Sequence, residues 1–188
     1  MNLLISSFLL LSAIARIQAR EGERARKLKS SSTSTLYAHL SPYPDYTGNL
    51  VVSGSVRVSF NSMPATELTY NFDIEGSESN CDGCGTHIHV GTTCDTDDDV
   101  GPHYFNIDLV DDQWTTEGGA VYNTDETGKG MGMFTVDNGY NVADNEGHTV
   151  VIHAQSGMRI GCGVLSSTAP KSPKVPKTTK APKSSKSS

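Results

Sequence analysis

Two histidines separated by a single residue, His87 and His89, are the clearest candidates for chemistry in this sequence. Residues i and i+2 of a β-strand point to the same face, so the two imidazoles would lie side by side while Ile88 faces a core. Two more histidines follow in comparable settings, His103 after Gly-Pro and His153 at the end of an apolar run. Four imidazoles without an obvious thiolate ligand are typical of a site for a metal such as copper or zinc.

Four cysteines, Cys81, Cys84, Cys94 and Cys162, indicate disulfide bonds. Secreted chains usually keep their cysteines oxidised, and residues 1–19 have the composition of a secretory signal. Four cysteines allow three pairings, which spacing alone leaves open. A zinc site at Cys81 and Cys84 is less favoured, because the chain has no second C-x-x-C motif.

Composition divides the chain into four segments. Residues 1–19 contain a short apolar run followed by small residues, which predicts a signal peptide rather than a membrane-spanning helix. Residues 20–34 are basic and then serine-rich, as in a disordered linker or a propeptide. Residues 35–166 are the expected folded domain, and residues 167–188 are a disordered tail rich in lysine, proline and serine. We therefore expect an extracellular or cell-wall protein without a membrane span.

Charge separates the folded domain from the tail. Residues 30–169 contain 19 acidic and three basic residues, whereas the tail contains six lysines and no acidic residue. An acidic domain lacks the basic face that neutralises nucleic-acid phosphates, so no nucleic-acid partner is expected. The tail lysines recur at every third position and would line one edge of a polyproline II helix. The tail is therefore a solvated linker, an arm that binds a polyanionic surface or matrix, or a segment that folds back onto the acidic domain.

Eight stretches have the alternating or β-rich pattern of strands, and turns rich in glycine and proline separate them. This pattern predicts an all-β, eight-stranded sandwich or barrel without helices of useful length. His39 is expected to be exposed on the first strand and His148 to begin the seventh, while Met131 and Met133 are expected to pack in the core. The acidic run at residues 95–99 is expected to be a solvated loop. The predicted strands cover approximately residues 35–41, 52–60, 67–74, 85–91, 120–123, 130–136, 149–154 and 159–165.

Four motifs, taken in order, resemble the copper/zinc superoxide dismutase family. They are His87-x-His89, Gly-Pro-His103, the apolar run that ends at His153, and Arg159-x-x-Cys-Gly. The similarity covers roughly residues 36–165, and the combination is far more specific than H-x-H alone. The resemblance implies a Greek-key β-barrel of eight strands that converts superoxide to oxygen and hydrogen peroxide.

The resemblance also implies roles for individual residues. His87, His89 and His153 match the ligands that bind only copper, and His103 matches the histidine that bridges copper and zinc. Arg159 matches the arginine that attracts superoxide, so Arg159 and His103 are the expected catalytic residues.

The cysteines fit the same resemblance. Cys94 and Cys162 match the disulfide within each subunit of the family, which ties the loop after the first histidine pair to the last strand. Cys81 and Cys84 are then left over, and we expect them to form a local disulfide.

Two departures from the family indicate a site that contains copper and no zinc. Between His103 and His148 the chain has no histidine, so the zinc ligands of the family are missing. Only five residues separate His153 from Arg159, where zinc-binding members have a long loop. Both losses resemble the secreted copper-only branch of the family.

In the copper-only branch an acidic side chain can orient the bridging histidine in place of zinc. Glu117 is the predicted candidate for this task, with Asp111 or Asp112 as alternatives. Two other functions remain open, namely a non-enzymatic copper-binding module and a matrix or cell-wall protein whose cationic tail binds polyanions. The sequence also leaves the oligomeric state open.

Overall fold

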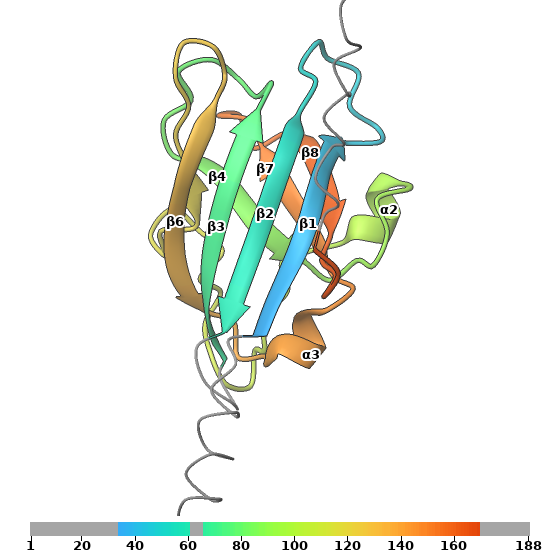
Figure 1. Cartoon of the computed structure of the whole chain (residues 1–188), viewed down its shortest axis with the longest axis vertical. Coiled ribbons are helices and arrows are strands. Elements are labelled where there is room, and N and C mark those ends of the chain that lie inside the picture. Colours follow the sequence, from blue (N-terminus) through green and yellow to red (C-terminus); the bar gives the residue numbers. More distant parts are fainter. Residues whose placement is uncertain (1–33, 61–65, 170–188) are drawn as a thin grey trace, which may run out of the picture.

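Eight antiparallel strands make up most of the regular structure in the described part of the chain. The computed structural model describes residues 34–60 and 66–169, so the predicted signal peptide, almost all of the linker and most of the tail lie outside the described residues. The strands follow the order β5-β4-β7-β8-β1-β2-β3-β6 in one sheet. In Figure 1 the sheet curls over so that β1, β2, β3 and β6 lie in front of β4, β7 and β8. The prediction of an all-β, eight-stranded barrel is confirmed.

All eight predicted strands are present, with ends that differ by a few residues. The structure adds two helices of one turn each, α2 and α3, that the sequence pattern did not indicate. Neither is long or apolar enough to cross a membrane, and the same holds for the rest of the described chain. The elements are β1 (Ser34–Pro42), β2 (Ser53–Phe60), β3 (Glu67–Glu75), β4 (Cys84–His89), α2 (Asp97–Val100), β5 (Val121–Tyr122), β6 (Gly130–Asp137), α3 (Val142–Asn145), β7 (Thr149–His153) and β8 (Arg159–Val164).

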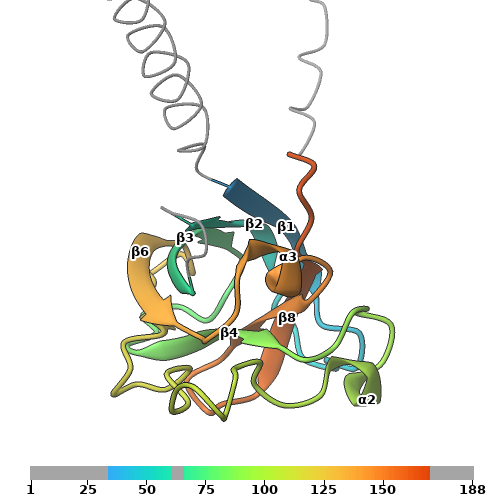
Figure 2. The same cartoon turned by 90° about the horizontal axis from the view of Figure 1, so that it is seen from below.

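Alternation of apolar and polar residues explains how the strands close around one core. Val58 pairs with Tyr70 and Val56 with Phe72 across β2 and β3, and all four side chains are buried. Burial of each large apolar side chain contributes about 1.5–3 kcal/mol. Seen from below in Figure 2, β2 and β3 lie opposite β4 and β8 across this filled interior. The core therefore holds β4 and β7, which carry three of the candidate ligands, in a fixed place.

The prediction that Met131 and Met133 pack in the core is wrong. Their exposed fractions are 79% and 65%, whereas Gly130 and Val136 of the same strand are buried. Alternation showed that the two methionines share one face of β6, but it did not show which face lies inward. The phase of the strand places them on the outside of the barrel.

Two disulfide bonds join the cysteine pairs expected from the sequence. Cys94 and Cys162 are 68 positions apart and link the segment after β4 to β8. Cys81 and Cys84 form the second bond, at the start of β4. A crosslink over a loop of this length limits the unfolded chain and stabilises the fold by about 4 kcal/mol. The longer bridge thus anchors α2 and its neighbours beside the strands that carry the histidines.

Candidate metal centre

Four histidines come together at one end of β4 and β7. His87 and His89 lie on β4, which pairs with β7, and His153 is the last residue of β7. His103 lies on the loop between α2 and β5, and its backbone forms an isolated bridge with His89. The ring centroid of His103 is 4.5 Å from that of His87 and 5.1 Å from that of His89, and the ring of His153 is 4.9 Å from that of His87. We call these four residues the histidine cluster.

Three ring nitrogens in the cluster are buried without a hydrogen-bond partner. They are Nδ1 of His87, Nε2 of His89 and Nε2 of His153. One ligand atom from each of these three residues lies within 4.8 Å of the others. A buried polar atom without a partner costs about 1–3 kcal/mol, so three at one point require an explanation. A metal ion bound to all three would satisfy them, and the residues therefore fit a metal.

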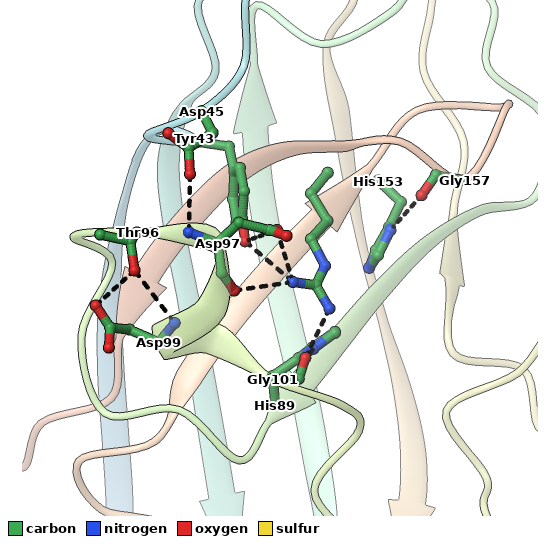
Figure 3. Close-up of polar contacts among 10 residues, drawn as sticks. Tyr43, Asp45, His89, Thr96, Asp97, Asp99, Gly101, His153 and Gly157 are labelled. Atoms are coloured by element: carbon green, nitrogen blue, oxygen red, sulfur yellow. Dashed lines mark hydrogen bonds and ion pairs between the residues drawn. The ribbon is translucent and has the colours of Figure 1, made fainter.

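The second ring nitrogens of two ligands are held by backbone carbonyls (Figure 3). His89 Nδ1 lies 2.8 Å from the carbonyl oxygen of Gly101, and His153 Nδ1 lies 2.9 Å from that of Gly157. A carbonyl oxygen can only accept, so Nδ1 carries the proton in both rings. The lone pair of each Nε2 is then directed into the cluster, which is how ligating histidines are normally oriented.

A carboxylate, Asp112, orients the fourth histidine. Nδ1 of His103 donates to Oδ2 of Asp112 at 2.8 Å, and the backbone N–H of Trp114 donates to Oδ1 of the same carboxylate at 2.9 Å. Asp112 was one of the two alternatives to Glu117. Glu117 instead lines a separate pocket together with His87 and His153. Asp111, the other alternative, is exposed.

Burial favours the neutral form of three candidate ligands, His87, His89 and His153. It lowers the pKa of His87 to about 2 and that of His89 to about 3, and it also lowers the pKa of His153. The charges that neighbouring histidines would carry add to this effect. Neutral imidazole is the form that binds a metal, so the cluster is ready to bind one without first losing protons.

Arg159 lies at the edge of the cluster. Its Nη2 donates to the carbonyl oxygen of Gly101 at 2.6 Å, the same oxygen that accepts from His89. A pocket of about 520 Å³ lies here, and we call it the metal pocket. It is lined by His89, Pro102, His103, Phe105, Asp112, His153, Gly157 and Arg159.

The acidic run contributes one contact that the sequence analysis missed. Residues 95–99 were expected to be a solvated loop, but Asp97 at the start of α2 forms an ion pair with Arg159, with Oδ1 2.9 Å from Nη1. The carbonyls of Gly101 and Gly157 were missed as well. Every residue has a backbone carbonyl, so the sequence does not show which ones accept hydrogen bonds. The sequence also does not show which of the five residues 95–99 contacts an arginine.

The two remaining histidines of the described chain lie outside the cluster. His39 is exposed on β1, as expected. His148 directly precedes β7, where its Nδ1 donates to the carbonyl oxygen of Val90 at 2.9 Å and its ring stacks on Tyr104 at 3.7 Å between centroids.

Comparisons with known proteins agree with the fold only in outline. No family model matches the sequence, and no curated protein matches it. A point mutant of Candida albicans superoxide dismutase 5 has a similar structure, with 13% identity, coverage of 76% of this chain and 96% of that chain, and a TM-score of 0.48. The clock protein EA4 is similar with 15% identity, coverage of 72% and 96%, and a TM-score of 0.48. At these values the function has to be argued from the geometry of the site.

The first prediction concerns the space beside His87. A Cβ added at Gly85 would lie 2.6 Å from Cε1 and 2.8 Å from Nε2 of His87, so Gly85→Ala must displace that ring. We expect copper affinity, measured by competition with a chelator, to fall about ten-fold or more. Gly132→Ala is the matched control, because its Cβ would meet the ring of Phe72 at 2.7 Å, away from the cluster. An equal loss of affinity in both variants would contradict the assignment.

The second prediction concerns acid stability without metal. The pKa of each of the three buried histidines is lower in the folded chain than in the unfolded chain, so at these three residues the unfolded chain gains protons at a higher pH, beginning near pH 6.5. The free energy of unfolding should therefore decrease as the pH is lowered, by up to about 1.4 kcal/mol per pH unit for each histidine. Urea unfolding of metal-free protein at pH 7, 6 and 5 measures this loss. It should be smaller when His87, His89 and His153 are all replaced by Asn and unchanged in His39→Asn; the same loss in all three proteins would refute the prediction.

Proposed function

We propose that this chain is a secreted, copper-dependent superoxide dismutase whose site contains no zinc. The observation that carries the proposal is the convergence of three buried, unpartnered imidazole nitrogens beside a fourth histidine that is oriented by a carboxylate. The order of the motifs in the sequence supports the same function independently of the geometry.

The donor set favours copper. All the candidate ligands are imidazoles, which suit copper in both of its oxidation states. The atom of His103 that would face a second metal is Nδ1, and it is already bonded to Asp112. The sequence also lacks further histidines between His103 and His148. These observations support a site for one copper ion formed by His87, His89, His103 and His153.

When bound, copper would supply the one-electron chemistry that converts two superoxide ions and two protons into oxygen and hydrogen peroxide. The residues of the chain do the rest. Arg159 supplies positive charge at the edge of the metal pocket and so attracts an anion. Asp112 holds the proton on Nδ1 of His103, so Nε2 is the ring atom that remains free to bind the metal or to carry a proton. The carbonyls of Gly101 and Gly157 keep the rings of His89 and His153 in position.

Secretion is part of the proposal. Two disulfide bonds among the described residues support an oxidising compartment. The composition of residues 1–19 supports export, and the lysine-rich tail supports attachment to a polyanionic surface.

The third prediction is a direct test by enzyme assay. Copper-loaded wild-type protein should remove superoxide catalytically, and His153→Asn should lose both copper and activity by about 100-fold or more. Arg159→Ala should keep its copper and lose about ten-fold in rate, because the four histidines remain while the attraction of the anion is lost. His39→Asn is the control and should behave as the wild-type protein does. Full copper occupancy without dismutation would overturn the proposal in favour of a copper-binding module.

A further inference from the structure

The guanidinium group of Arg159 is largely engaged by the chain itself. Nη1 donates to Oδ1 of Asp97 at 2.9 Å and lies 3.1 Å from the hydroxyl oxygen of Tyr43, while Nη2 donates to Gly101. A guanidinium has five N–H groups. One N–H of Nη2 and the N–H of Nε have no partner among residues 34–60 and 66–169. Because Nη2 shares its acceptor with His89, this free edge of the group is the one beside the histidine cluster.

Asp97 is itself fixed from two directions (Figure 3). The hydroxyl of Tyr43 donates to Oδ1 of Asp97 at 2.6 Å, and the backbone N–H of Asp97 donates to the carboxylate of Asp45 at 2.9 Å. Tyr43 and Asp45 follow β1, whereas Asp97 begins α2. The carboxylate that meets Arg159 is therefore a built feature of the fold, and not a loose surface charge that happens to lie nearby.

The charge of Arg159 matters because few other cations are available. The described residues include only Arg57, Lys129 and Arg159 as lysine or arginine. Lys129 pairs with Glu75, and Arg159 is the only arginine or lysine that lines the metal pocket. A negative group beside Arg159 therefore weakens the attraction of the metal pocket for an anion.

We propose that Asp97 is a positioning residue for Arg159 that also limits the attraction of anions to the metal pocket. This inference rests on the proposed function, since it concerns how the same site meets an anionic substrate. Asp97 holds Nη1 at the outer side, so that the free N–H groups of Nη2 and Nε stay directed to the side of the histidine cluster. Its negative charge partly cancels that of the guanidinium, and the pocket attracts anions less strongly than an unpaired arginine would.

Replacement of Asp97 by Asn separates the two effects. The amide oxygen can still accept from Tyr43 and Arg159, but the negative charge is lost. Anion affinity should then rise while the guanidinium keeps its place. Asp98→Asn is the matched control, because Asp98 lies in the same turn of α2, is exposed and forms no hydrogen bond or ion pair with Arg159.

The fourth prediction is tested by azide titration of the copper-loaded protein, followed by its visible absorption. Asp97→Asn should bind azide about three- to ten-fold more tightly than wild type at low ionic strength, and this gain should shrink in high salt. Asp98→Asn should change the azide dissociation constant less than about two-fold. An equal gain in both variants would show an effect of net charge alone, and no gain in Asp97→Asn would show that Asp97 does not limit the attraction; either result would overturn the inference.

The positioning role has its own measurement. In metal-free protein the NMR chemical shift of the Nε–H of Arg159 should stay the same in Asp97→Asn. It should change in Asp97→Ala, where Nη1 loses its carboxylate partner and keeps only Tyr43 and the backbone oxygen of residue 97. An unchanged signal in Asp97→Ala would overturn this part. The same signal follows azide binding when copper is absent, so the inference is tested even if wild-type protein takes up no copper. That last outcome would refute the proposed function alone.

Discussion

Three buried imidazole nitrogens that face one another without partners are the constraint on which this structure depends. Each would cost about 1–3 kcal/mol if it stayed unsatisfied. The barrel nevertheless holds them together, because β4 pairs with β7 and two backbone carbonyls fix the outer nitrogens of His89 and His153. A fold that brings together buried ring nitrogens whose lone pairs lack partners is arranged for a ligand that supplies positive charge. A set of imidazoles without a thiolate suits a metal ion such as copper or zinc, and copper is the ion that we propose.

The carbonyl oxygen of Gly101 connects a candidate ligand, His89, to Arg159. It accepts from His89 and from Arg159, so the orientation of a ligand ring and that of the guanidinium depend on the same peptide group. That peptide group directly follows α2, and α2 lies near the bridge between Cys94 and Cys162. A disulfide, a one-turn helix and an ion pair thus work together to place one positive charge beside four histidines.

Much of this arrangement could be predicted from the sequence, and the reasons are physical. Strands such as β3 alternate with a period of two and β7 is a continuous apolar run, so the eight strands and the shared face of His87 and His89 could be predicted. Alternation does not show which face of an edge strand lies inward. Met131 and Met133 were therefore assigned to the core, although they face outward. Which carboxylate reaches His103 depends on the path of a loop. Three acidic residues lay within range, and the geometry selects Asp112. Contacts made by backbone carbonyls leave no trace in the residue types at all.

The metal content of wild-type protein tests the central claim most directly. Mass spectrometry of the metals in purified protein should give one copper per chain and no stoichiometric zinc. Electron paramagnetic resonance of the oxidised form should show a Cu(II) centre with nitrogen ligands, and the signal should be lost in His89→Asn. Stoichiometric zinc in this site, or a chain that binds no copper when it is offered in excess, would contradict the account.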